Sequence, residues 1–559
     1  MKKLFLTGLL AAGTLPGAHA TNYYVASGAN APVAGVDRTT NGQGLSAALP
    51  FATIQYAADL TLPGDTVFVR AGTYTRTESW RPPVLDIKRS GTPAKWIVYR
   101  NYPGDTQRPL LQFNGWQGIN MKGGAYVEIN GFRIQGNNRN VTLAAATNQP
   151  GSCANPAGSS DPQYNGSGIN ISEGSGRNYP HHVRVRNNEV FECGGAGIGT
   201  GQADYITIEN NLVYNNAWYS RYGNSGISMN SSVDYDTAPG YHMVIRNNRV
   251  FGNRMFVPWR TDKCMGITDG NGVILDLNNN TNDDATGDVL KPYTGRFLVA
   301  NNLIVNNGGA GVQVFKTERA DLINNTCYRN ARSPELNVTA SAESYNIRGE
   351  VLLNQAVQVL VQNNIFVTDN LSKVNAAGTF PTLTYTHNLH FGGLGTPLAG
   401  ASTLTADPQF VNATTDWATA DFRLKAMSPA IDQGLNSQLS ATDLAGNPRV
   451  AGPNPDLGAY ETPAVLTATA GARPPRGLEA YPNPFAGRVT LRYVTARPGA
   501  VRLEVVDALG RRVALLVDEP QPAGAHEVAF TAPTRAAGLY HVLLTTPDGR
   551  AQQTLLAER

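Results

Sequence analysis

The chain has 559 residues, of which 16% are charged, and its formal net charge is +3. This weak, mixed charge excludes the strongly basic composition typical of nucleic-acid-binding proteins, while it permits an acidic polymer as partner. No apolar run is long enough to span a bilayer, so the sequence predicts no transmembrane segment.

The N-terminus has the pattern of an export signal. Lys2 and Lys3 form a basic start, an apolar run extends to Leu15, and "AHA" at 18–20 is a small-residue cleavage site. We therefore predict residues 1–20 to be a signal peptide and expect the mature chain to leave the cytoplasm.

The stretch "PFATIQYAADL" (50–60) has the periodicity of a short amphipathic helix. Its apolar residues Phe51, Ile54, Ala57 and Ala58 fall on one helical face. We expect this helix to cover the start of the fold that follows, because an uncovered sheet edge would be open to pairing with other chains.

Two phrases repeat through the middle of the chain. One contains an Asn-Asn pair, as in "DYITIENNLVYNN" and "GRFLVANNLIVNN", and occurs at 181–193, 204–216, 241–253, 295–307, 319–330 and 358–370. The other starts with Gly and alternates apolar residues, as in "SGISMN" and "NGVILD". The shortest spacing between Asn-Asn pairs is 23 residues, which leaves room for three short strands and no helix. Because one such unit cannot bury its apolar face alone, the repeat predicts a parallel β-helix with one unit per rung.

The Asn-Asn pairs support stacked corners. An Asn tolerates the left-handed backbone conformation of a tight corner. Stacked rung on rung, its side-chain amide can bond the Asn above and below, so we expect an interior Asn ladder.

The repeat resembles that of the right-handed parallel β-helix proteins, with pectate lyases among them, over residues 64–395. "YYVASG" (23–28) and "GDTVFVRAGTY" (64–74) are similar to the way these proteins begin. The resemblance implies an all-β fold, with three strands per rung and an N-terminal capping helix, over residues 21–405.

The Gly-led strands predict a binding groove. Alternate residues of a strand point to opposite faces, so the apolar ones point inward and the others outward. Stacking then places Ser172, Gly201, Asn230, Asp276 and Phe315 in one outward column. The longer insertions flank this strand on both sides, so we expect their loops to wall a groove suited to an extended polymer.

The stretch "DKCMGITDGNGVILD" is the candidate working site beside this groove. The candidate residues, in chain order, are His242, Trp259, Arg260, Asp262, Lys263, Asp269, Asn271, Asp276, Tyr293, Arg296, Gln313 and Lys316. We predict that Trp259, Tyr293, Arg296, His242 and Gln313 bind substrate, and that Lys316, Lys263, Arg260 and Asp276 take part in catalysis.

The resemblance implies a polysaccharide lyase acting on a uronate-containing polymer. Such a reaction needs a cation to neutralise the carboxylate, a base to take the adjacent proton, and protonation of the leaving oxygen. Calcium suits the first role, and Asp262, Asp269, Asn271 and Asp276 have the oxygen ligands that it takes. Lys316 and Lys263 are the candidate bases, and Arg260 or Arg296 can clamp a carboxylate.

The sequence departs from the calcium-dependent lyases at the Gly-led strand. Those enzymes carry acidic residues around the Gly and a catalytic Lys two residues after it, where this chain has Ile274 and Gln313. Three alternatives therefore stay open. "TDGNG" can be a plain turn, Asp269 and Asp276 can be the paired carboxyls of a glycoside hydrolase, and the chain can be a glycan-binding surface protein without activity.

Residues 406–559 predict how the protein leaves the cell and which partner it uses. Residues 406–466 resemble a choice-of-anchor segment, expected to finish the last rungs, and 467–477 read as a linker. In 478–559, "YPNPF", "DALGRRV" and "GLYHV" resemble a type IX secretion C-terminal sorting domain. This implies a small β-sandwich, the secretion machinery of a Bacteroidota-type cell as partner, and an extracellular or surface-anchored, monomeric protein.

The chain has four cysteines, at positions 153, 193, 264 and 327. Export would allow them to oxidise, and three pairings are possible. No CxxC motif occurs, so we expect no zinc site.

Overall fold

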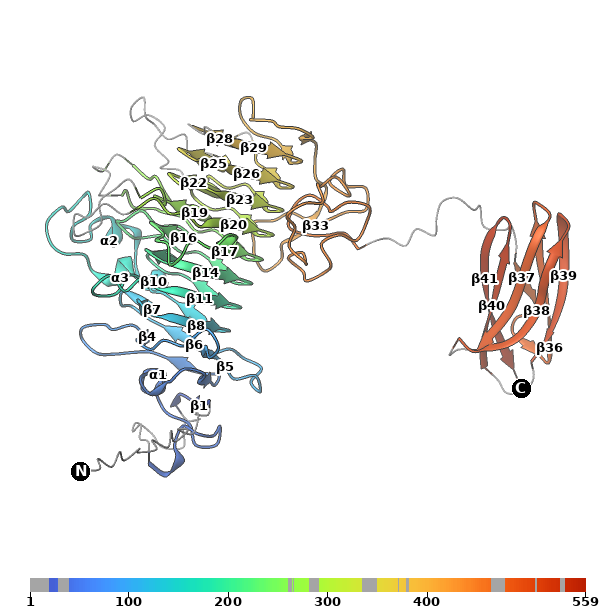
Figure 1. The fold of residues 1–559 in the computed structure, drawn as a ribbon, viewed down its shortest axis with the longest axis horizontal. Helices are drawn as coiled ribbons and strands as arrows, with labels where there is room; N and C mark the ends of the chain where they lie inside the picture. Colours follow the sequence, from blue (N-terminus) through green and yellow to red (C-terminus); the bar gives the residue numbers. More distant parts are fainter. Residues whose placement is uncertain are drawn as a thin grey trace, which may run out of the picture. The chain divides into compact units, whose positions relative to one another are not determined.

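The computed structural model describes residues 20–28, 40–259, 264, 266–280, 291–333, 349–369, 371–378, 382–463, 478–507, 510–532 and 538–558. The chain forms two compact units, Met1–Pro463 and Ala464–Arg559. In the first unit, short strands stack in parallel along one axis (Figure 1). The predicted all-β fold, a parallel β-helix with three strands per rung, is confirmed.

Three sheets form the helix. We call the first the Gly-led sheet; it consists of β4 (Leu85–Ile87), β7 (Gln117–Lys122), β10 (Ser167–Ser172), β13 (Ile198–Gly201), β16 (Ile227–Asn230), β19 (Val273–Asp276), β22 (Val312–Phe315), β25 (Gly349–Asn354) and β28 (Lys373–Ala377). The second sheet consists of β1 (Asn22–Val25), β2 (Thr66–Val69), β5 (Ile97–Asn101), β8 (Ala125–Asn130), β11 (His181–Arg186), β14 (Asp204–Glu209), β17 (Tyr241–Arg246), β20 (Arg296–Ala300), β23 (Ala320–Ile323), β26 (Val359–Gln362) and β29 (Leu383–Thr386). The third consists of β3 (Thr73–Tyr74), β6 (Leu110–Gln112), β9 (Arg133–Gln135), β12 (Glu189–Phe191), β15 (Leu212–Tyr214), β18 (Arg249–Phe251), β21 (Leu303–Val305), β24 (Thr326–Tyr328), β27 (Ile365–Val367), β30 (Leu389–Phe391) and β31 (Leu404–Thr405).

The helix α1 (Ile54–Leu60) forms within the predicted stretch 50–60 but begins only at Ile54. The Thr53 hydroxyl accepts a hydrogen bond from the Tyr56 N–H at 3.3 Å and caps its first turn. Ile54, Ala57 and Ala58 are buried, as is Phe51 before the helix. Two further short helices, α2 (Leu143–Thr147) and α3 (Pro162–Asn165), lie in the loop that precedes β10.

A buried Asn ladder holds the corner between the second and third sheets. Each side-chain amide donates to the side-chain oxygen of the Asn one rung later, at 2.9–3.1 Å. The residue before each ladder Asn takes the left-handed conformation, for example Asn210 at φ 58°. The ladder consists of Asn188, Asn211, Asn248, Asn302, Asn325, Asn364 and Asn388.

We expect Asn248→Ala to destabilise the helix by about 2–4 kcal/mol. The Asn248 amide donates to the Ile208 carbonyl and to Asn302, and its oxygen accepts from the Asn211 backbone and side chain. The alanine would leave several of these buried groups without partners, each costing about 1–3 kcal/mol with partial relaxation. Urea unfolding measures the loss, and the exposed Asn436→Ala is the control that should change little. An Asn248 variant as stable as the control would contradict a stabilising ladder.

Residues 406–463 do more than finish the last rungs. They contain β32 (Phe410–Asn412) and β33 (Asp421–Leu424), and they pack across the outer face of the third sheet. Phe422 and Tyr460 lie in one buried cluster with Phe251 and Tyr328 of that sheet. The sequence predicted that this segment finishes the last rungs; in the structure it also covers the third sheet, because the apolar outer face of that sheet needs a cover.

One of the three possible cysteine pairings forms. Cys153 and Cys264 are joined by a disulfide, with Cα atoms 5.6 Å apart. This disulfide ties the α2–α3 loop to the loop before β19. Cys193 and Cys327 are buried thiols, and burial raises the pKa of both.

The second unit is a small antiparallel β-sandwich. One sheet holds β34 (Glu479–Tyr481), β36 (Arg488–Thr495) and β39 (Gly524–Thr531). The other holds β35 (Phe485–Ala486), β37 (Gly499–Asp507), β38 (Arg512–Gln521), β40 (Gly538–Thr546) and β41 (Gly549–Glu558). The linker predicted at 467–477 lies outside the described residues. Within the described chain, no helix has the length and apolar character that crossing a membrane requires.

Candidate functional site

The outward column of the Gly-led sheet forms as predicted. Ser172 pairs with Gly201, Gly201 with Asn230, Asn230 with Asp276, and Asp276 with Phe315. The alternating inward residues are buried along the same strands. Residues far apart in the sequence therefore meet along one exterior line.

Asp276 is the carboxyl on this line, at the end of β19. Its Oδ2 accepts a hydrogen bond from the Asn230 amide at 3.0 Å. Burial raises the pKa of Asp276 to about 6, although the Asn230 hydrogen bond and the charge of Lys316 both act in the opposite direction. A carboxyl with this pKa can take or give a proton near neutral pH.

Lys316 lies next to this carboxyl, one strand further along. It follows β22 in the left-handed conformation, at φ 44°, and its ammonium lies 5.5 Å from the centre of the Phe315 ring. Because Phe315 pairs with Asp276, this turn brings the cation close enough to affect the pKa of Asp276. The structure therefore brings together Asp276 and Lys316, which are 40 residues apart in the sequence.

Two of the other predicted metal ligands, Asp269 and Asn271, do not join Asp276. Asp269 and Asn271 precede β19, while Asp276 ends it, and the strand's three residue steps alone span about 10 Å. The amide oxygen of Asn271, which is fully buried, accepts from the Ala310 N–H at 2.8 Å. The prediction that Asp269, Asn271 and Asp276 form one ligand set was wrong, because the strand separates their side chains.

Calcium takes six to eight oxygen ligands, usually several of them carboxylates. Of the predicted carboxylate ligands that the structure describes, Asp276 alone lies in the outward column, so the described residues do not fit a calcium site. Three further candidates, Arg260, Asp262 and Lys263, lie outside the described residues.

The loop before β19 lies partly over the groove floor instead of standing beside it. Met255 and Ile267 from this loop are buried in one cluster with Leu352 and Ala376, which point outward from β25 and β28. Trp259 packs against the same cluster.

Gln313, predicted to bind substrate, points outward from β22 between Ile274 and Leu352. It is only 6% exposed, however, and its side-chain oxygen has no hydrogen-bond partner among the described residues. Burial makes it unavailable for direct contact with a polymer in this structure.

Three predicted substrate-binding residues lie around the second sheet instead. The Tyr293 hydroxyl donates to the buried Asp204 at 2.5 Å, and His242 contacts Asp204 at 3.1 Å. Both are 2% exposed, so their rings present no free face to a sugar. Arg296 donates to Asp321 at 2.8 Å. The expectation that these residues line the groove was wrong, because Asp204 and Asp321 bind them.

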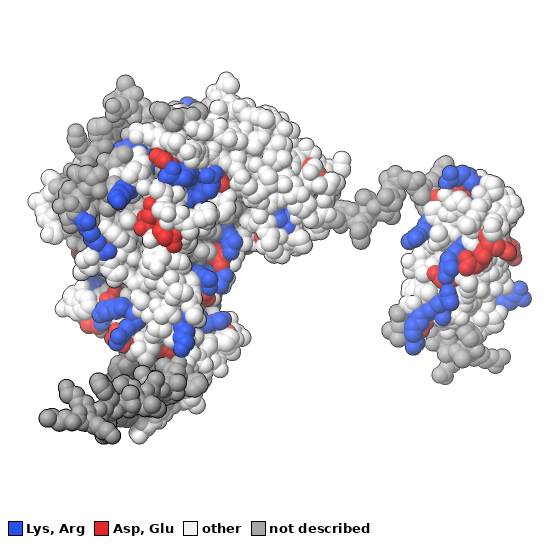
Figure 2. Space-filling model, in the orientation of Figure 1, with Lys and Arg blue, Asp and Glu red and all other residues white. Residues whose placement is uncertain are grey.

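On the face of the first unit that Figure 2 shows, the charged residues are mixed in sign. In Figure 2, Lys and Arg side chains lie beside Asp and Glu side chains in small groups of both signs. An example is Glu209, which pairs with Arg246 at 2.7 Å and also with Arg186.

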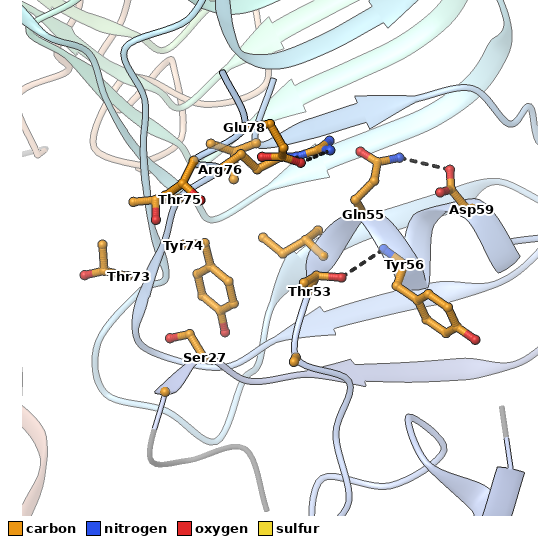
Figure 3. Close-up of a pocket in the computed structure, with 15 residues that line it drawn as sticks. Ser27, Thr53, Gln55, Tyr56, Asp59, Thr73, Tyr74, Thr75, Arg76 and Glu78 are labelled. Atoms are coloured by element: carbon orange, nitrogen blue, oxygen red, sulfur yellow. Dashed lines mark hydrogen bonds and ion pairs between the residues drawn. The ribbon is translucent and has the colours of Figure 1, made fainter. Parts of the chain in front are cut away.

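Several hollows occur at the N-terminal end of the helix. One, of about 600 Å³, lies beside α1 and is lined by Gln55, Tyr74, Arg76 and Glu78 (Figure 3). Another, of about 390 Å³, lies on the outward face of β4 and β7 and is lined by Trp80, Trp116, Lys88 and Lys122. The sequence analysis missed this second hollow because these rungs lack the Asn-Asn phrase. The two tryptophans in "SWRPP" and "FNGW" were the available signal.

Comparison with known proteins places the fold. Residues 35–346 match the family described as the Pel9A-like, right-handed beta helix region. Among solved structures, pectate lyase Pel9A is 14% identical, with 80% of this chain and 97% of that chain covered at a TM-score of 0.43. The GH136 lacto-N-biosidase from Eubacterium ramulus is 12% identical, with 66% and 56% covered at a TM-score of 0.34.

Two further similarities are more limited. The A-module of the mannuronan C-5 epimerase AlgE4 from Azotobacter vinelandii is 14% identical, with 63% of this chain and 90% of that module covered at a TM-score of 0.30. A curated relative, uncharacterized protein YwoF of Bacillus subtilis (strain 168), is 41% identical over 56 residues. That match spans 10% of each of the two chains. Because the family match covers more than half of the sequence, the chain belongs to the Pel9A-like right-handed beta helix family.

Proposed function

We propose that this protein cleaves an acidic, uronate-containing polysaccharide by β-elimination on the outward face of the Gly-led sheet. Asp276 and Lys316 are the reacting pair. The observation that carries the proposal is their meeting on this face: a partly buried carboxyl beside a cation, on a rigid sheet. The pectate lyase fold and the family membership support the substrate class.

The proposed reaction assigns one role to each group. Lys316 neutralises the uronate carboxylate, which acidifies the adjacent C–H. The Asp276 carboxylate takes that proton, the C–H electrons form a carbon–carbon double bond, and the bond to the leaving sugar oxygen breaks. The same carboxyl then returns its proton to the leaving oxygen, so the enzyme ends unchanged. This assignment differs from the sequence prediction, in which Lys316 was the base.

That calcium assists the reaction stays a prediction. No step above depends on it, because the described residues supply too few oxygen ligands. The hydrolase alternative is weaker for a related reason: Asp269 lies before β19 and Asp276 at its end, so the two do not face each other across a cleft.

A substrate screen tests the proposal. We expect absorbance near 235 nm to rise with at least one of pectate, alginate and glycosaminoglycans, because elimination creates a conjugated double bond. Parallel assays with a chelator measure the requirement for calcium. Release of reducing ends without this absorbance would indicate hydrolysis, and binding without either signal would indicate a glycan-binding protein; both outcomes would overturn the lyase proposal.

We also propose that the protein is exported and that its second unit is the type IX sorting domain. The support is the signal-peptide pattern and the three sorting-domain phrases, together with the sandwich architecture of that unit. Fractionation of cells expressing chains with and without residues 478–559 tests this, and equal export of both would contradict it.

A further inference from the structure

The outward face of the Gly-led sheet is open at one end and covered at the other. At the later strands, Ile274, Gln313 and Leu352 point outward but are at most 6% exposed. At the early strands, Trp80 is 69% exposed and Trp116 is 38% exposed. These covered residues form the row through Ile274, two positions before the column of Asp276, and in that row an open hollow of about 390 Å³ lies at β4 and β7.

Two lysines stand side by side at this hollow. Ile87 pairs with Met121, so the register places Lys88 beside Lys122, and Lys122 pairs with Ser172 of the outward column. Lys88 has a weak contact with Asp86, at 3.5 Å and with 66% of its side chain exposed. Lys122 is exposed and has no ion-pair partner among the described residues.

The floor between the lysines and the tryptophans is already ordered. The Asn120 amide donates to Asp86 at 2.8 Å, and the Asn170 amide donates to Asn120 at 3.1 Å. These bonds fix the polar groups across three neighbouring strands. A ligand would therefore meet a pre-arranged surface and lose little free energy in ordering it.

We infer that this hollow is a subsite for an anionic sugar residue of a polysaccharide, bound remotely from the reacting pair. The apolar face of a sugar ring packs on Trp116 or Trp80, since aromatic rings offer a large, rigid apolar surface. The sugar's anionic group is bound by Lys122, with Lys88 beside it. The inference rests on the proposed function in one respect only, namely that an acidic polymer lies along this face.

The subsite lies a defined distance from Asp276. From β7 to β19 the Gly-led sheet advances through four strand spacings, by way of β10, β13 and β16. At about 4.8 Å per spacing, Lys122 and Asp276 are about 19 Å apart along the column. A short oligosaccharide bound at Asp276 cannot reach the subsite, while a long chain can occupy both.

Substrate length therefore gives the decisive measurement. On the polymer that the protein cleaves, we expect Lys122→Gln and Trp116→Ala each to raise KM about tenfold for long chains and to leave kcat unchanged. With oligomers from the trimer to the decamer, the effect should appear only above a threshold length. The controls are Lys425→Gln and Trp417→Ala; Trp417 is also 38% exposed but packs against Tyr214 of the third sheet.

An equal rise in KM for trimer and polymer, or no rise at any length, would overturn the subsite.

A binding assay tests the subsite even if the protein cleaves no polymer. The absence of cleavage would contradict only the proposed function. In gels that contain polygalacturonate, alginate or hyaluronan, at least one polymer should retard the wild-type chain more than the Lys122 and Trp116 variants. Methyl-esterified polygalacturonate, which lacks the charge, should retard it less than polygalacturonate does. The subsite would also be overturned if no gel with an acidic polymer retarded the wild-type chain. The same holds if polygalacturonate and its methyl ester retarded the chain equally.

Discussion

Replacing Asp276 with Asn should lower kcat by about a hundredfold to ten-thousandfold, the usual contribution of a group that transfers a proton. The substitution is nearly isosteric, and its amide oxygen can still accept the hydrogen bond from Asn230. The loss should therefore appear in turnover rather than in folding. Absorbance near 235 nm, on the polymer identified by the screen, measures it.

The pH profile separates Asp276 from a merely structural residue. The pKa of this carboxyl is raised to about 6, so the carboxylate form grows as the pH rises from 5 to 7. If Asp276 takes the proton, kcat/KM should rise over this range with a midpoint near 6. A rate that falls through the same midpoint would assign it the acid role instead and contradict the proposed reaction.

Matched variants complete this test. Lys316→Gln should cost about a hundredfold or more, because it removes the cation that stabilises the developing charge. The controls Lys425→Gln and Asp407→Asn alter exposed groups away from the Gly-led sheet and should leave activity unchanged. Full activity in both the Asp276 and the Lys316 variants would show that the reaction takes place at other residues.

The second large effect concerns Glu350, which is fully buried at the start of β25. Its two oxygens accept from the Asn330 backbone at 3.0 Å and from the Asn330 amide at 2.6 Å. It thus ends a second ladder, in which Asn216, Asn253 and Asn307 precede Asn330. Burial raises the pKa of Glu350 to about 8.

This shift makes stability depend on pH. Because the folded-state pKa lies above the unfolded value, the native state binds more protons between about pH 4.5 and 8. The stability is therefore fully present below pH 4.5 and is lost as the pH rises through 8. We expect the free energy of unfolding to fall by ~4 kcal/mol from this group between pH 5 and pH 9.

Glu350→Gln should remove this dependence. Gln has only one acceptor oxygen, so the variant should be less stable than wild type by about 1–3 kcal/mol at pH 5. At pH 9 it should be the more stable of the two, so the curves cross. Urea unfolding at both pH values measures this, with the partly exposed Glu173→Gln as control. Parallel curves for wild type and the Glu350 variant would show that the carboxyl does not titrate in this range.

The sequence alone determined the scaffold. Strand alternation has a period of two, so the inward positions of Ile227 and Met229 could be read from "SGISMN". Each rung pairs with its neighbours in register, so the alignment of the Gly-led phrases also predicted that Asn230, Asp276 and Phe315 share a column. Both inferences rest on local geometry repeated from rung to rung.

Only the tertiary structure decided which side chains the column leaves accessible. The loop that contains Met255 folds over Leu352, and Asp204 binds Tyr293; neither contact follows from a repeat. The same holds for the choice of Cys153 and Cys264 among three pairings. Loops that interrupt the rungs pack through contacts between distant residues, so the sequence fixes no register for them. For this reason the scaffold and the place of Asp276 in the outward column could be predicted, while the contacts of the loop residues could not.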